Sequence, residues 1–183
     1  MPRKRYPRRK FIRDVGALAG GATLLSGCGK APSRQWRFFT EAEAGVLAAV
    51  WEQIIPADQD PGAVDAGVPN FIDLQLTRHY KRHQETYRTG LEGVQQTSTA
   101  LYGRRFEELK WDDQTRVLET LESGKAPGSA WASRNPRTFF NLVRDHSMQG
   151  FYGSPRHGGN RNYVSYRMLG IDYPQVIGQN RYE

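Results

Sequence analysis

Residues 40–56 read TEAEAGVLAAVWEQIIP, and this stretch decides the class of fold. Thr40 and Glu43 have the spacing of a capping box. In this motif the threonine hydroxyl accepts a hydrogen bond from the Glu43 amide, and the glutamate side chain accepts one from the Thr40 amide. Apolar residues then recur at helical spacing, and they are Val46, Leu47, Val50, Trp51, Ile54 and Ile55. Because Pro56 cannot continue the hydrogen-bond pattern, it ends the segment. The stretch predicts an amphipathic helix.

A second helix is predicted after a loop over residues 57–68. It begins near Pro69 and continues to Val94, with a break near Gly90 or Gly93, because glycine weakens a helix interior.

Two further helices are predicted nearer the C-terminus. One follows Trp111 and ends at Gly124, and the other starts with Asn135 as cap and Pro136 in its first turn, then decays at Gly150. No segment alternates convincingly as a strand would, and there is no internal repeat. The expected fold is mainly α, a small irregular helical domain with long loops.

From Phe151 onward, apolar residues no longer recur at helical spacing. Residues 151–162 read FYGSPRHGGNRN, a short helical turn is expected over 163–169, and residues 170–183 are expected to form an extended C-terminal segment. Glycines with arginines and aromatics between them are typical of protein interfaces. The alternative is an ordered loop that caps its own core.

We therefore expect residues 150–169 to be buried against a partner protein. A segment of this composition, folded only on itself, has few apolar contacts to offset a backbone entropy loss of ~1–2 kcal/mol per residue. The expected principal contacts are Tyr152, Arg156, Asn160 and Arg167.

The first 27 residues have the composition of an export signal. A basic head that contains Arg8, Arg9 and Phe11 precedes a short apolar run and a small-residue end. Paired arginines are typical of the twin-arginine route, which carries folded proteins. The alternative is a weak amphipathic helix. The predicted organisation is a signal peptide over 1–27, a tether over 28–38 and one helical domain over 39–183.

Cys28 ends the motif Leu25-Ser26-Gly27-Cys28, which resembles a bacterial lipobox. In such a motif the cysteine is lipidated and becomes the mature N-terminus. The alternative is ordinary signal-peptidase cleavage nearby, with Cys28 incidental. Since Cys28 is the only cysteine, an internal disulfide, covalent haem attachment through two cysteines and a multi-cysteine metal site are excluded.

Most of the net charge of +7 comes from the first 27 residues, which hold seven basic groups and one acid. The rest of the chain has 19 basic and 18 acidic groups, so it is nearly neutral. A general nucleic-acid-binding surface would need a retained excess of basic groups. We therefore expect no nucleic-acid partner.

Two histidine pairs are candidates for chemistry. His79 and His83 would share a helix face and could bind zinc, but a third ligand is missing and the cations between them oppose a metal ion, which favours an ordinary polar face. His146 and His157 bracket the glycine-rich stretch and could act as general bases. No activated nucleophile stands near either in sequence apart from Ser147 and Ser154, and neither serine sits in a Gly-x-Ser-x-Gly turn.

Residues 146–160, which read HSMQGFYGSPRHGGN, and residues 166–170, which read YRMLG, resemble the gluconate 2-dehydrogenase subunit 3 family. The resemblance extends to the start of the first helix at 39–41, to residues 54–57 and to the order of the helices. It covers essentially the whole chain after the signal.

The resemblance implies the small subunit of a bacterial membrane-bound dehydrogenase for a sugar, polyol or sugar acid. Its large subunit would bind FAD and oxidise the substrate, and a multi-haem cytochrome c subunit would pass electrons to quinone. This chain would hold no cofactor and no catalytic residue. The twin-arginine translocase would export this chain and the large subunit together. The destination would be the periplasm, at the outer face of the cytoplasmic membrane. Contact with the cytochrome is left open.

The rival expectation comes from a different class of protein. It is a free-standing periplasmic lipoprotein enzyme, such as a hydrolase that uses His146 or His157.

Overall fold

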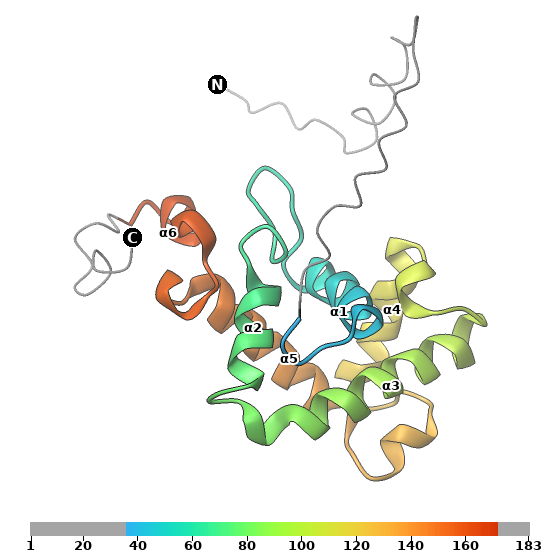
Figure 1. Ribbon diagram of the computed structural model, residues 1–183. Helices are drawn as coiled ribbons and strands as arrows, with labels where there is room; N and C mark the ends of the chain where they lie inside the picture. Colours follow the sequence, from blue (N-terminus) through green and yellow to red (C-terminus); the bar gives the residue numbers. More distant parts are fainter. Residues whose placement is uncertain (1–35, 172–183) are drawn as a thin grey trace, which may run out of the picture. The chain divides into compact units, whose positions relative to one another are not determined.

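The computed structural model describes residues 36–171 (Figure 1). The expected signal peptide, most of the tether and nearly all of the extended C-terminal segment lie outside these residues. Within them the chain forms α-helices joined by loops and short 3₁₀ helices, and no strand. The mainly α fold class is therefore confirmed. The α-helices are α1 (Glu41–Ile54), α2 (Val68–Leu76), α3 (Gln84–Tyr102), α4 (Trp111–Glu122), α5 (Pro136–Tyr152) and α6 (Val164–Met168).

Helix α1 begins as its sequence predicts. The Glu43 amide donates to the Thr40 hydroxyl at 3.2 Å, and the Thr40 amide donates to the Glu43 carboxylate at 2.8 Å. Leu47 and Trp51 on its inner face are completely buried. The capping box and the apolar stripe together direct this helix into the core.

The expected long second helix is in fact two helices, and the break lies at residues 77–83. The Thr77 hydroxyl donates to the Leu74 carbonyl at 2.8 Å, and the Gln84 amide group donates to the Leu76 carbonyl at 2.9 Å. Side chains thus satisfy the carbonyls that α2 leaves free at its C-terminus. The chain turns there and restarts as α3.

Gly90 and Gly93, where the break was expected, lie inside an unbroken α3. A Cβ on Gly90 would approach the Phe139 ring to 2.2 Å, and one on Gly93 would approach the Trp131 ring to 2.3 Å. These glycines therefore allow two aromatic rings to lie against the helix backbone, and the expectation of a break at either was wrong.

Helix α4 ends and helix α5 begins where the sequence predicts. Gly124, with φ of +76°, follows α4, and the Asn135 side chain accepts from the Arg137 amide at 2.9 Å at the start of α5. Helix α5 does not decay at Gly150 but continues to Tyr152. Gly150 is helical, and its lack of a side chain lets Phe71 pack there, 2.8 Å from the position of an added Cβ.

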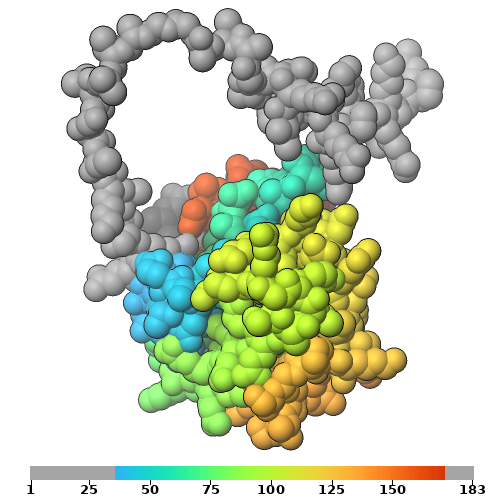
Figure 2. Space-filling view, turned by 90° about the vertical axis from the view of Figure 1, so that its right-hand side faces the viewer, coloured from blue at the N-terminus to red at the C-terminus, as the bar shows by residue number. Residues whose placement is uncertain are grey.

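The core lies between α5 and the helices around it (Figure 1). Helix α5 packs against α2, α3 and α4, and α1 packs against α4. Figure 2 shows the face on which α3, α4 and the connection before α5 lie close together; the 3₁₀ helix Ser129–Ala132 in this connection packs on α3. None of the helices in residues 36–171 is long and apolar enough to span a membrane.

Asp73 on α2 ties the chain that precedes α1 to the core. Its carboxylate is buried and accepts from the backbone amides of Arg37 and Phe38, both at 2.9 Å, and of Phe39 at 3.2 Å. Hydrogen bonds to an ionised group are stronger than neutral ones. This single side chain therefore positions the start of the helical domain.

Candidate partner interface

The C-terminal segment after α5 runs beside α2 and is held there by hydrogen bonds (Figure 1). The Asn160 amide donates to the Gly150 carbonyl and the Arg161 amide donates to the Ala66 carbonyl, both at 2.8 Å. The Asn70 side chain donates to the Gly158 carbonyl at 2.8 Å. The backbones meet so closely at Gly159 that an added Cβ would lie 2.1 Å from the Gly150 carbonyl oxygen. Glycine at 159 therefore permits the fold of this segment.

Three of the four side chains that the sequence indicates for an interface are exposed. They are Tyr152, Arg156 and Arg167. Large apolar side chains are also exposed in this part of the chain, on α5, on α6 and just after α6: Met148, Met168, Leu169 and Ile171. Arginines beside exposed apolar groups are typical of surfaces that bind another protein.

Asn160 differs from that expectation, because its side chain is 0% exposed. Its amide NH₂ donates to the Gly153 carbonyl at 2.9 Å, and its amide oxygen accepts from the Ser165 amide at 3.0 Å. Both polar groups are thus satisfied within the chain. Asn160 therefore shapes the segment from inside and does not present an exposed contact.

The segment also has more contacts of its own than its composition predicts. Phe151 and Val164 are buried in the common core, and the backbone hydrogen bonds to Gly150 and Ala66 add to them. The argument that only a partner could offset its ordering entropy is therefore weakened. Burial of residues 150–169 against another chain stays a prediction.

The turn that leads into α6 has an uncommon backbone. Asn160, Asn162 and Tyr163 have φ values of 42°, 54° and 57°. Asparagine tolerates this left-handed region, but for tyrosine it costs about 1–3 kcal/mol. The hydrogen bonds of Asn160 on both sides of the turn hold it in place.

Comparison with known proteins supports the resemblance seen in these residues. The profile of the family described as gluconate 2-dehydrogenase subunit 3 matches residues 41–172. This range includes the six α-helices of the described residues 36–171 and the residues 153–171 that follow α5. The chain belongs to the gluconate 2-dehydrogenase subunit 3 family. No curated protein and no solved structure gives a significant match.

In this subunit 3 chain a cluster of rings surrounds the buried His146 on α5. The Tyr87 hydroxyl and His146 Nδ1 are hydrogen-bonded at 3.0 Å, and the Tyr80 ring stacks on the imidazole with centroids 3.9 Å apart. His83 meets the same imidazole edge to face at 5.3 Å. Burial, and then the nearby His83, lower the pKa of His146 to about 4, so it is neutral at neutral pH. Burial raises the pKa of Tyr87 well above its usual range.

The stability of the subunit should fall in acid because of His146. Its pKa is about 4 in the folded chain against 6.5 for the free side chain, so the unfolded chain binds a proton that the folded chain does not. Between pH 6.5 and 4 this difference should lower the free energy of unfolding by about 3 kcal/mol. Chemical denaturation across this pH range measures it.

The matched variants for this test are His146→Gln and His157→Gln. The first removes the buried titrating group and should flatten the pH dependence. The second removes an exposed imidazole whose pKa is lowered less, so it should change the pH dependence less. Equal pH dependence in wild type and His146→Gln would contradict the assignment.

The geometry gives no support to hydrolysis by His146 or His157. The Ser147 hydroxyl donates to the Val143 carbonyl at 2.6 Å, and His157 Nε2 accepts from Arg156 at 3.1 Å. Within residues 36–171 no serine or threonine hydroxyl is hydrogen-bonded to either histidine. The nucleophile and base that this alternative needs are not brought together.

The zinc alternative for His79 and His83, which the sequence already disfavours, depended on a shared helix face that the structure does not form. His79 lies in the turn after α2 and His83 ends a 3₁₀ helix over Lys81–His83. The part of the chain that the structure describes contains no cluster of three or more potential metal ligands. Sequence reasoning assigned the two residues to one face because it placed the helix break too late.

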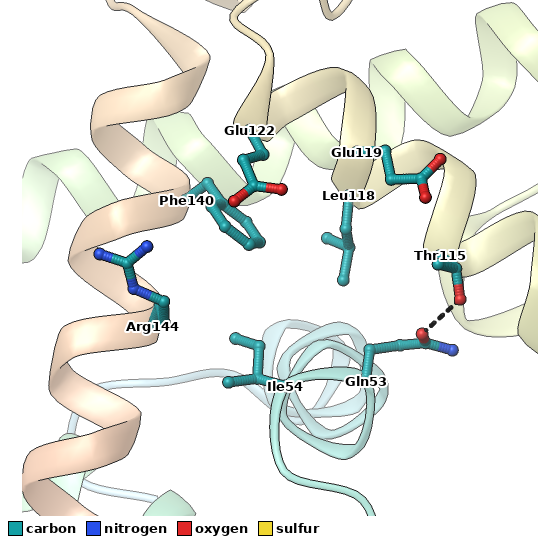
Figure 3. A pocket seen from close by; sticks show the side chains of 8 residues that line it. All are labelled: Gln53, Ile54, Thr115, Leu118, Glu119, Glu122, Phe140 and Arg144. Carbon is teal, nitrogen blue, oxygen red and sulfur yellow. Dashed lines mark hydrogen bonds between the residues drawn. The ribbon is translucent and has the colours of Figure 1, made fainter.

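A groove between α1, α4 and α5 was not indicated by any sequence motif (Figure 3). Apolar side chains of Ile54, Leu118 and Phe140 form its floor, and Figure 3 shows Glu119 and Glu122 on one side with Arg144 on another. Gln53 accepts from the Thr115 hydroxyl at 2.8 Å across its edge. The groove has an apolar floor and charged walls, but nothing in the structure shows what covers it.

Proposed function

We propose that this chain is the non-catalytic small subunit of a membrane-bound FAD-dependent dehydrogenase that oxidises a sugar, a polyol or a sugar acid. The observation that carries the proposal is the family match over residues 41–172. In this proposal FAD lies in the large subunit and haem c in a cytochrome subunit. This chain assists the folding and assembly of the large subunit.

The exposed C-terminal surface supports the role of a binding partner. Tyr152, Arg156 and Arg167 lie on a segment that hydrogen bonds hold in one conformation, so a partner would meet a preformed surface. A preformed surface loses less conformational entropy on binding than a flexible one does.

We further propose that the chain and its flavin partner are exported together by the twin-arginine translocase. Arg8, Arg9 and Phe11 form the export signal, and the complex then stays in the periplasm at the outer face of the cytoplasmic membrane. Several acyl chains on Cys28 would anchor it firmly, because one chain alone binds a membrane weakly.

The test is expression of the flavin-binding subunit with and without this chain. We expect flavin incorporation, export and substrate oxidation only when both are present, and no turnover by this chain alone. An exported, active flavin subunit made without this chain would overturn the assembly role. Substrate turnover by the purified chain alone would overturn the non-catalytic assignment.

Cys28→Ser is expected to leave export intact and to abolish lipid attachment, because serine offers no thiol for acylation. Incorporation of labelled fatty acid into wild type and variant measures this. A wild-type protein without label, or a mature N-terminus elsewhere, would show that Leu25-Ser26-Gly27-Cys28 is an ordinary cleavage region.

A further inference from the structure

One side of the described domain is rich in cations. Two segments form it, the turn over 77–84 and the C-terminal segment over 150–171, and neither contains an aspartate or a glutamate. We call its six exposed cations the basic face: Arg78, Lys81, Arg82, Arg156, Arg161 and Arg167.

The turn lies against α5 and the C-terminal segment lies against α2, and residues of both segments line one hollow. The Gln75 side chain near the end of α2 donates to the His157 carbonyl at 3.3 Å, and Tyr80 in the turn is hydrogen-bonded to Gln149 on α5. Near the start of α2, the Arg161 side chain lies beside Gly67. The basic face therefore follows the length of α2.

Within residues 36–171, the acids nearest in sequence to the two segments already have other partners. Asp73 accepts from three backbone amides, Glu85 pairs with Arg134 at 3.0 Å, and Asp145 pairs with Arg144 at 3.0 Å. Within residues 36–171 none of the six cations forms an ion pair with a carboxylate. Their charges repel one another, and an acidic surface brought to them would offset this repulsion.

A hollow of about 340 Å³ opens in this face. Its floor includes Phe71 and Tyr80, and two histidines, His79 from the turn and His157 from the C-terminal segment, stand at its rim. A side chain with a carboxylate fits this chemistry, because imidazoles and guanidinium groups donate hydrogen bonds to carboxylate oxygens.

We propose that the basic face docks onto an acidic surface of the flavin-binding subunit, and that a carboxylate side chain of that subunit enters the hollow between His79 and His157. This inference rests on the proposed function, which supplies the partner. Five of the six cations are arginines, whose planar guanidinium groups pair with carboxylates through two hydrogen bonds. The hollow favours a shaped protein surface over the flat surface of a membrane.

The experiment compares two charge-reversal pairs in the full-length mature chain. Arg156→Glu with Arg167→Glu changes the basic face. Arg116→Glu with Lys125→Glu makes the same change of charge at exposed cations on and just after α4, which form no ion pair within residues 36–171. Binding to the purified flavin-binding subunit is measured for each, and circular dichroism checks the helical content.

We expect the basic-face pair to weaken binding by about 10- to 100-fold, and the control pair to change it little. Added NaCl should weaken the wild-type complex, because salt screens charges at the edge of an interface. Equal effects of the two pairs, or no effect of the basic-face pair while wild type binds, would overturn this inference alone. Failure of the wild-type chain to bind the flavin-binding subunit would overturn the proposed function as well.

The last part of the experiment measures binding of the wild type and of the basic-face pair to vesicles of anionic phosphatidylglycerol. If the basic-face pair abolished binding to these vesicles and left binding to the flavin-binding subunit unchanged, the face would be a lipid surface and the inference would be wrong. Retained vesicle binding, together with lost subunit binding, supports it.

Discussion

Gly159→Ala is expected to destabilise the domain by about 2–3 kcal/mol, because the new methyl group meets backbone and not a side chain that could move. Its Cβ would lie 2.1 Å from the Gly150 carbonyl oxygen, which accepts the hydrogen bond of the Asn160 amide. Relief of the contact requires the C-terminal segment to move away from α5, so the bond should break. Thermal and chemical denaturation measure the loss.

The same substitution should weaken binding to the flavin subunit, since the displaced segment carries Arg156 and Arg167. Gly45→Ala is the matched control. Gly45 is exposed on α1 with nothing within 4 Å of an added Cβ, so alanine there should stabilise the helix by about 0.5–1 kcal/mol. If Gly159→Ala were as stable as wild type, the close approach of the two backbones would be wrong.

Local signals in the sequence were sufficient to predict most helix ends. The capping box at Thr40, the Asn135 cap and Gly124 each act through atoms within a few residues, and the structure has all three. Gly90 and Gly93 gave the wrong prediction because their role depends on Phe139 and Trp131, more than thirty residues away. A single sequence does not distinguish a glycine that ends a helix from a glycine that lets an aromatic ring pack against the helix backbone.

The sequence indicates residues 150–169 as a partner interface, and that contact stays a prediction. Arg156 and Arg167 are exposed in the structure, as contact with a partner requires. Asn160 was placed among the contacts as part of this segment, yet it is buried with both polar groups satisfied at Gly153 and Ser165. It also adopts a positive φ, which no local pattern in the sequence indicates.

The basic face shows a further limit of prediction from the sequence. Residues 77–84 are separated from residues 150–171 by more than sixty positions, and only the packing of α5 on α2 brings them together. The near-neutral charge of the chain after the signal also hides the local excess of cations, because it averages over the whole surface. Charge complementarity with a partner could therefore be argued only from the fold.

Arg8→Lys combined with Arg9→Lys is expected to abolish export of both this chain and its flavin partner. In the proposed function, the paired arginines are the part of the signal that the twin-arginine translocase would read, and an ammonium group cannot reproduce the planar, forked donors of guanidinium. The charge is unchanged, so general electrostatic attraction to the membrane is preserved. Fractionation followed by detection of both subunits in cytoplasm and periplasm measures the result.

Arg3→Lys combined with Arg5→Lys is the matched control, because it makes the same chemical change in the same basic head but leaves the pair intact. Export should then continue. If the double change at Arg8 and Arg9 stopped this chain while the flavin subunit still reached the periplasm, co-export would be wrong, and the partner would need a signal of its own. If both were stopped, the folded complex would be the unit that crosses the membrane, and docking of the two subunits would have to precede export.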